Sequence, residues 1–272
     1  MNSSVTPDDP SELLVEDADA VRYLKLNRPQ RFNALSRSLC ESLAAALRAA
    51  AADPAVRCVV LTGEGKAFCA GGDVGVQASD AASQSVASET FADGLRSRME
   101  SVCLLHEMPK PTIAMVNGVA AGAGMSLALA CDLRIASDKA RMTTSFSKVG
   151  LSGDYGGSYF LTALVGPAVA RELYFMSPVL EIERLLSLGL VSRKASEHSL
   201  REETHAMAME LARGPTLAFR YIKRNMNLAM HGTLDDVMTS EVFGTMRTLA
   251  STDHLEGVQA FMQKRPADFK GA

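Results

Sequence analysis

The segment that most constrains the fold runs from Lys110 to Ser126, with the sequence KPTIAMVNGVAAGAGMS. A proline precedes a short run rich in β-branched residues, Asn117-Gly118 follows, and only small residues lead into the apolar Leu127–Cys131. This order predicts a buried strand, a tight turn, and a helix entered through Gly122 and Gly124. Small residues permit close approach to the backbone, and a helix N-terminus presents unpaired N–H donors. We therefore expect this segment to bind a developing negative charge.

The pattern of apolar residues predicts that strands and helices alternate over the first two thirds of the chain. The expected strands lie at 20–26, 56–62, 112–116 and 132–136, and the expected helices at 36–52, 88–107, 157–164, 168–176 and 182–188. Ser36 is the predicted N-cap of the first helix. This alternation indicates an α/β core with a largely parallel sheet and right-handed crossovers.

The pattern changes from Ser196 onward, where four amphipathic helices are expected in succession, at about 197–213, 215–230, 233–250 and 254–264. Their apolar faces need partners, and a neighbouring subunit is a plausible one. We therefore expect three parts: a disordered lead-in over 1–12, the α/β core over 13–195, and a helical region over 196–272.

Composition and motifs exclude several classes of function. The formal net charge of −3 argues against a dedicated nucleic-acid surface, and no apolar run is long enough for a membrane span. The five cysteines are scattered, without a CxxC motif, which indicates reduced thiols in a cytoplasmic protein. Neither HExxH nor another zinc-ligand spacing occurs. The acidic N-terminus is unlike a signal peptide.

Two turns made of small residues are the first candidates for chemistry: Ala70-Gly71-Gly72-Asp73 and Gly122-Ala123-Gly124. If both lie at strand-to-helix junctions, two backbone N–H groups could converge as an oxyanion hole. Each could also be simply a tight turn. The second turn does not complete GxGxxG, because position 127 is leucine.

Asp154 is the second candidate. It lies in Leu151-Ser152-Gly153-Asp154-Tyr155-Gly156-Gly157, between apolar segments and just before an expected helix. It could cap that helix, or it could be a carboxylate beside a pocket, able to take and return a proton. The residues themselves leave the two interpretations about equally open.

At these residues the chain resembles the enoyl-CoA hydratase/isomerase, or crotonase, superfamily, from about Val15 to Gly271. The matching segments are Arg28-Pro29, Asn33-Ala34-Leu35, Ala67 to Asp73, Lys110-Pro111, Asn117 to Gly124, Cys131 to Ala136, Gly156-Gly157, and Phe261 to Arg265. The resemblance implies a crotonase-like core of repeated ββα units and a C-terminal helical region that builds trimers, often paired into hexamers.

The resemblance also implies an acyl-CoA substrate and a set of site residues. The two oxyanion donors would be the N–H groups of Gly72 and Ala123. Substrate and CoA contacts would come from Arg28, Ala34, Ala70, Asp73, Val74, Val119, Gly122, Ser126 and Lys264, the last reaching over from another subunit. It implies no metal and no redox cofactor, with coenzyme A present only as part of the substrate.

One departure from the family pattern is the most informative. The 2-enoyl-CoA hydratases of this family place two glutamates around a water, at positions where this chain has Ser126 and Phe146. Asp154 instead matches an aspartate found in several isomerases of the family, and FSKVGLSGDYGG resembles the phenylacetate-pathway ring isomerases. We therefore expect an isomerase in which Asp154 moves the proton.

Two alternatives stay open. One is a hydratase or another lyase of fatty-acid β-oxidation that uses a different carboxylate, such as Glu89, Asp93 or Glu100 of the helix expected beside the acyl pocket. The other is a non-catalytic acyl-CoA binder, suggested by the loss of both glutamates and opposed by the retention of both oxyanion turns.

Overall fold

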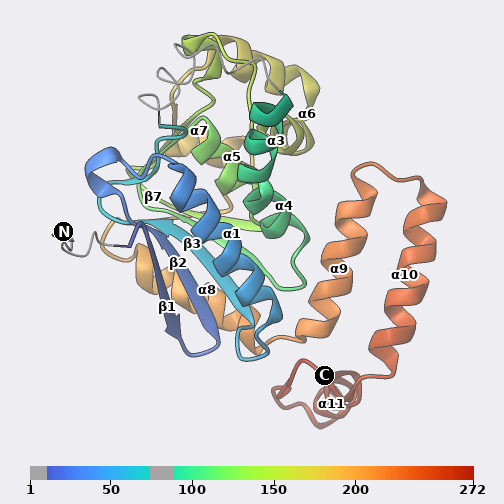
Figure 1. The fold of residues 1–272 in the computed structure, drawn as a ribbon. Helices are drawn as coiled ribbons and strands as arrows, with labels where there is room; N and C mark the ends of the chain where they lie inside the picture. Colours follow the sequence, from blue (N-terminus) through green and yellow to red (C-terminus); the bar gives the residue numbers. More distant parts are fainter. Residues whose placement is uncertain (1–10, 74–88) are drawn as a thin grey trace, which may run out of the picture.

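The computed structural model describes residues 11–73 and 89–272, and within them the core contains a six-stranded sheet (Figure 1). Its strand order is β1-β2-β3-β5-β7-β10, with β1 antiparallel to β2 and every other pair parallel. The strands are β1 Leu13–Ala18, β2 Val21–Leu26, β3 Cys58–Gly63, β5 Thr112–Val116, β7 Leu133–Ser137 and β10 Arg193–Ala195. The expected α/β core with a largely parallel sheet is thereby confirmed.

A second sheet of four short strands, ordered β4-β6-β8-β9, lies beside the first. Its members are β4 Ala67–Cys69, β6 Val119–Ala121, β8 Arg141–Thr143 and β9 Leu180–Glu181. Each of β3, β5 and β7 is followed along the chain by one short strand of the second sheet and then by helix. This repetition is the ββα arrangement that the family resemblance predicted.

Helices cover both faces of the first sheet, α1 on one side and α8 on the other (Figure 1). Alternate residues of β2 belong to different cores: Leu24 and Leu26 pack with α1, whereas Val21 and Tyr23 pack with α8. The helices of the core are α1 Arg37–Ala52, α3 Glu89–Arg98, α4 Glu100–Glu107, α5 Ala123–Ala130, α6 Gly157–Met176, α7 Ile182–Ser187 and α8 Leu200–Arg213, with 3-10 turns η1 Pro29–Arg31 and η3 Phe146–Val149.

The last three helices stand to one side of the core (Figure 1). They are α9 Thr216–Ala229, α10 Leu234–Leu249 and α11 Thr252–Gln263. Large apolar side chains of α10 are exposed, among them Leu234, Met238 and Phe243. Such a face is suited to subunit packing, but a single chain does not test it, so the trimer stays a prediction. No helix in the described ranges is long and apolar enough to cross a membrane.

Several sequence expectations about the elements were wrong in detail. Strand β1 was not predicted, because Leu13 is its one buried residue and the strand shows no apolar alternation. The strands of the second sheet have two or three residues each, which is too short for a periodicity to register. The helix expected over 88–107 is divided at Met99 into α3 and α4.

The two helices expected over 157–164 and 168–176 are confirmed, because α6 consists of two helical stretches separated by non-helical backbone at Gly166 (φ 76°, ψ 161°), directly before Pro167. Ser36 caps α1 as expected, accepting a hydrogen bond from the Leu39 N–H. At the N-terminus, residues 1–10 of the expected lead-in lie outside the described residues. Glu12 is part of the fold, because its carboxylate accepts hydrogen bonds from Ser36 and Ser38.

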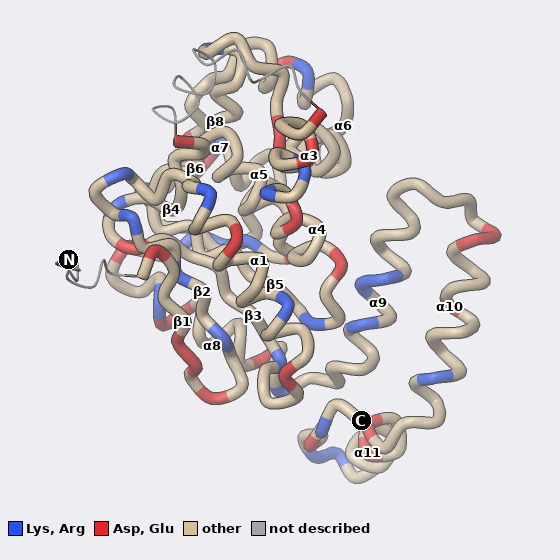
Figure 2. The backbone as a smooth tube through the Cα atoms, in the orientation of Figure 1, with Lys and Arg blue, Asp and Glu red and all other residues tan. Residues whose placement is uncertain are grey.

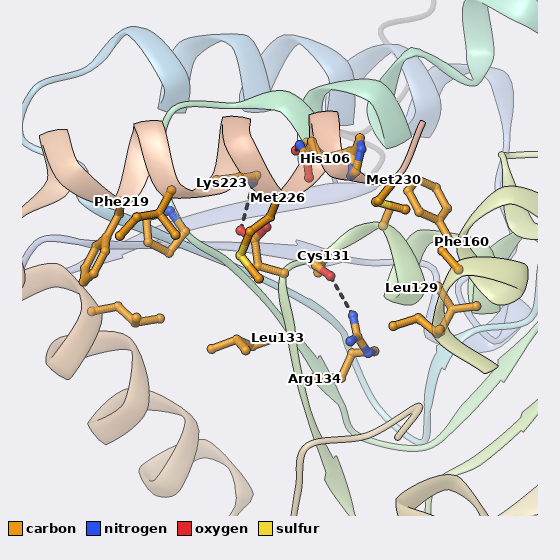
Figure 3. A pocket seen from close by; sticks show the side chains of 18 residues that line it. His106, Leu129, Cys131, Leu133, Arg134, Phe160, Phe219, Lys223, Met226 and Met230 are labelled. Carbon is orange, nitrogen blue, oxygen red and sulfur yellow. Dashed lines mark hydrogen bonds and ion pairs between the residues drawn. The ribbon is translucent and has the colours of Figure 1, made fainter. Parts of the chain in front are cut away.

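Lys223 joins α9 to the core (Figure 3). Its ammonium lies 2.8 Å from the Asp132 carboxylate and donates to the carbonyls of Leu105 and Lys110 at 2.8 and 3.3 Å. A cavity of about 440 Å³ lies between α9 and the core, and Lys223, Met226 and Met230 of α9 line it. A charge that is this buried is stable only while its partners stay in place.

We expect Lys223→Met to lower the free energy of unfolding by about 2–3 kcal/mol, because it leaves Asp132 without its cation and two carbonyls without a donor. In thermal melts this corresponds to a decrease of about 5 °C or more. Lys194→Met is the matched control, since Lys194 forms an exposed pair with Glu183 that contributes at most about 1 kcal/mol. Equal melting temperatures for the two variants would contradict this role.

Candidate active site

The two small-residue turns of the sequence lie in direct contact. Strands β4 and β6 are parallel neighbours, so the turns that follow them emerge at the same edge of the second sheet. A Cβ added to Gly124 would lie 2.1 Å from the Cys69 carbonyl oxygen. One added to Gly71, whose φ is +97°, would lie 2.8 Å from the Ala121 oxygen. Glycine is therefore required at both positions, because the two backbones touch there.

This contact places the two expected donors near each other. Leu35 donates to the Gly71 carbonyl at 2.8 Å and accepts from Asp73 N–H at 3.4 Å, forming a parallel bridge with Gly72. Gly72 is the middle residue of this bridge, so its own N–H points away from Leu35. Ala123 is the first residue of α5, so its N–H has no acceptor within the helix. The Ala123 nitrogen lies only 3.5 Å from the Cβ position of Gly71.

Helix α5 supports this arrangement electrostatically. All eight of its residues are buried, and none is charged (Figure 2). Its N-terminus carries the positive end of the helix dipole, in a medium where no side chain of the helix screens it. The N-cap residue, Gly122, has φ 52° and lies against the ring of Phe146. The two turns can thus supply two N–H donors and a positive potential to one anionic atom.

Asp154 lies in a turn of left-handed backbone, with φ of 110° at Gly153, 50° at Tyr155 and 68° at Gly156. Its carbonyl oxygen accepts from the Ser126 hydroxyl at 3.3 Å and from the Gly157 N–H at 3.1 Å. The bond from Ser126 connects the turn to α5, and the bond from Gly157 joins it to the start of α6. The side chain does not cap α6, whose N-cap is Gly156 without a side-chain hydrogen bond. The helix-capping interpretation of Asp154 is therefore wrong.

The pKa of the Asp154 carboxyl lies close to neutral pH. Its Oδ1 atom is buried and has no hydrogen-bond partner among the described residues. Burial raises the pKa of the carboxyl from 3.8 to about 6, and the nearby Arg98 cation opposes that rise. An unpartnered carboxyl oxygen with a pKa near neutrality is typical of a group that exchanges a proton during a reaction.

The two positions where hydratases of the family carry glutamates hold no acid. Ser126 is 1% exposed, and its hydroxyl donates to the carbonyls of Gly122 and Asp154. Phe146 is buried and stacks on Tyr174, with ring centroids 6.0 Å apart. The crevice between Ser126, Phe146 and Tyr174 is too narrow for a water molecule. These two positions therefore provide no second base.

The alternative carboxylates differ from Asp154 in their surroundings. Glu89 and Asp93 of α3 are exposed, and Glu100 of α4 forms an ion pair with Arg48. In the described ranges, no group of three or more histidine, cysteine, aspartate or glutamate side chains is placed to hold a metal ion. Asp154 is thus the acid that the described residues place next to Ser126.

The loop proposed to hold coenzyme A is braced by Arg28. Its guanidinium donates to the Ala34 carbonyl at 2.5 Å and contacts the carboxylates of Asp73 and Glu12 at 3.2 and 2.8 Å. Ala70 joins the same loop, since its N–H donates to the Phe32 carbonyl at 2.9 Å. Arg28, Ala34, Ala70 and Asp73 are thus brought together beside Gly72, with the guanidinium occupied by protein acceptors.

The remaining predicted contact residues are distributed more widely. Val119 opens β6 and is 41% exposed. Val74 lies outside the described residues. Lys264 follows α11, which lies far from the oxyanion turns of the same chain (Figure 1). The structure therefore does not bring Lys264 to the site from within its own chain.

Three residues near Asp154 were missed by the sequence analysis. Tyr155 is buried, and its hydroxyl contacts the Cys40 sulfur of α1 at 3.1 Å, which fixes the turn in place. Arg98 is the cation that acts on Asp154, and Tyr174 packs on the turn from the end of α6. Adjacency to Asp154 could have indicated Tyr155, but no sequence signal pointed to Arg98 or Tyr174.

Comparison with known proteins agrees with this geometry. The family model for enoyl-CoA hydratase/isomerase matches residues 16–272. A 1,2-epoxyphenylacetyl-CoA isomerase of Escherichia coli is 36% identical over 92% of this chain and 95% of its own length. A probable enoyl-CoA hydratase of Rhodobacter capsulatus is 35% identical, over 94% and 96%. The crystal structure of an enoyl-CoA hydratase from Polaromonas superimposes with a TM-score of 0.89 at 35% identity, covering 94% of this chain and 99% of that one.

The raised pKa of Asp154 predicts a pH-dependent effect of Asp154→Asn on stability. The folded protein keeps the carboxyl proton up to about pH 6, whereas the unfolded chain releases it near 3.8. The associated stability is complete below pH 3.8 and is lost as the pH rises through about 6. We expect the variant to be more stable than the native protein by about 1–2 kcal/mol at pH 8, allowing for partial exposure, and equal to it near pH 4. Thermal melts of both proteins between pH 4 and 8 measure this, and a difference independent of pH would contradict it.

Proposed function

Because this chain belongs to the enoyl-CoA hydratase/isomerase family, we propose that it is an enoyl-CoA isomerase in which Asp154 moves the proton. The substrate is an unsaturated acyl-CoA thioester, and the reaction shifts the position of the carbon–carbon double bond. The observation that carries this proposal is the Asp154 carboxyl, which has a buried oxygen without a partner among the described residues and belongs to a residue whose backbone carbonyl accepts from Ser126.

The oxyanion turns supply the electrostatic part of the reaction. Removal of a proton next to the thioester carbonyl places negative charge on its oxygen, which becomes an enolate. Donors from Gly72 and Ala123 bind this oxygen more strongly than the neutral carbonyl, so they lower the barrier rather than only improving substrate binding. Their contact through Gly71 and Gly124 supports this role, because it fixes the donors before the charge develops.

Asp154 supplies the proton transfer in both directions. As a carboxylate it takes a proton from the α or γ carbon, and the electron pair of the broken C–H bond moves into the enolate. As a carboxylic acid it then returns the same proton to the other carbon, and the double bond forms at its new position. A pKa of about 6 suits both steps, because neither protonation state is costly near neutral pH.

Isomerisation consumes no water, whereas hydration requires one that is held and activated. The positions of the hydratase glutamates are Ser126 and Phe146, and the crevice beside them does not admit a water molecule. This supports an isomerase over a hydratase. The coenzyme A part of the substrate would lie along the loop braced by Arg28. Lys264 would contribute from a second copy of the chain, in keeping with the exposed apolar face of α10.

We expect Asp154→Asn to lower the rate of 3-enoyl-CoA isomerisation by about a hundred- to ten-thousandfold. In the native enzyme, kcat/KM should fall about tenfold per pH unit below pH 6, because the base becomes protonated. The control is Asp19→Asn, which changes an exposed aspartate in the turn between β1 and β2. A near-native rate for Asp154→Asn would refute the assignment.

Hydration provides the test between the two classes of enzyme. With crotonyl-CoA we expect formation of 3-hydroxybutyryl-CoA to be at least about a hundredfold slower than isomerisation of 3-hexenoyl-CoA by the same preparation. Comparable rates would support a hydratase that uses a carboxylate other than the family pair. Tight binding of both esters without turnover would support the non-catalytic binder.

A further inference from the structure

The Tyr155 hydroxyl and the Cys40 thiol form a hydrogen bond between the Asp154 turn and helix α1. The oxygen and the sulfur are 3.1 Å apart, and each is the only side-chain hydrogen-bond partner of the other among the described residues. Both residues are buried, Tyr155 4% and Cys40 3% exposed. Burial raises the pKa of both groups, so both keep their protons at neutral pH and either can be the donor.

The Asp154 turn relies on this anchor because its backbone is conformationally permissive. Gly153 and Gly156 have φ of 110° and 68°, and glycine has many alternatives to such values. Tyr155 has φ 50°, a conformation that a residue with a side chain keeps only where its surroundings hold it. Its ring packs in the main core, and Cys40 holds its polar end. The direction of the neighbouring Asp154 side chain therefore follows from where Tyr155 is held.

The start of α1 reaches the oxyanion turn as well. Leu35 forms the parallel bridge with Gly72, and its N–H donates to the Gly71 carbonyl at 2.8 Å. Ser36 caps the helix, and its carbonyl accepts the Cys40 N–H at 3.1 Å. The segment from Leu35 to Cys40 thus contacts both turns, one through its backbone and the other through a thiol.

We propose that Cys40 and Tyr155 are positioning residues of the isomerisation, and that the start of α1 sets the distance between the Asp154 carboxyl and the enolate oxygen. This inference rests on the proposed function, which assigns the proton transfer to Asp154. Cys40 and Tyr155 do not touch the reacting atoms, and both act through the backbone of the turn. Proton transfer depends steeply on such placement, since a displacement of about 1 Å can cost about a hundredfold in rate.

The test compares Tyr155→Phe, Cys40→Ala and Cys40→Ser in the isomerisation of 3-hexenoyl-CoA. The first two variants delete one side of the hydrogen bond. They should lower kcat about ten- to a hundredfold with KM nearly unchanged, because placement affects the transition state rather than binding. Cys40→Ser keeps a hydroxyl that can replace the thiol, so its kcat should remain close to the native value. Cys58→Ala is the matched control, because it also removes a buried thiol, but in the core on the other face of the sheet.

Repeating Tyr155→Phe in the Asp154→Asn background separates positioning from general stability. A residue that acts only through the Asp154 carboxyl has nothing left to position there, so the second change should lower the residual rate by less than about twofold. A merely structural residue would lower it by the same factor in both backgrounds. That result would overturn the proposal, as would native kcat in Tyr155→Phe or in Cys40→Ala, or a Cys40→Ser variant as slow as Cys40→Ala.

Crystal structures of the variants report the position of the Asp154 carboxyl without any reaction. If that carboxyl moves in Tyr155→Phe while Asp154→Asn isomerises at the native rate, the proposed function fails and the anchoring role stands. If Asp154→Asn is inactive while the carboxyl and kcat are unchanged in Tyr155→Phe, the proposed function stands and the positioning role fails.

Discussion

The close contact between two backbones, Gly124 on the Cys69 carbonyl and Gly71 on the Ala121 carbonyl, is the constraint on which the rest of the site depends. Neither turn alone provides two convergent donors. The two turns meet because β4 and β6 are adjacent and parallel. This in turn requires the chain to pass from the first sheet to the second in the same way after β3 and after β5. The second sheet is small, but it fixes the spacing between Gly72 and Ala123, which carry the two proposed donors. Its function is positional, and the large sheet supplies the stability.

The large sheet can supply that stability because it is buried on both faces. Strands β3 and β5 have only buried residues, packed between α1 on one side and α8 on the other. Every residue of α5 is also buried, so the helix that begins at the site has no solvent-facing side along which it could shift. A donor at the first residue of such a helix is held by the whole core. This explains how a backbone N–H can be held in a precise position for binding.

The sequence predicted the secondary-structure elements that are long or capped. It did not predict the contacts that form only when distant segments pack together. The strands near 58–63 and 112–116 and the helix capped by Ser36 followed from local patterns. Three-residue strands carry no period, so the second sheet was missed, although the resemblance implied its ββα repeats. The residues around Asp154 left its role open, because capping and proton transfer favour the same local sequence, and only the family resemblance favoured proton transfer. Arg98 and Tyr174 reach it from α3 and α6 through packing, which no local pattern encodes.

The surroundings of Asp154 show how the fold balances stability against reactivity. Burial without a partner for Oδ1 destabilises the charged carboxylate, and the left-handed residue Tyr155 adds backbone strain. The same residue offsets that strain, since its ring is buried in the core and its hydroxyl contacts Cys40. Burial alone would favour the neutral acid, and the Arg98 cation limits this, leaving a pKa of about 6. A direct ion pair would instead have fixed the carboxylate in its charged form. A cation that acts without a hydrogen bond to the carboxylate keeps both forms accessible, which a group that takes and returns a proton requires.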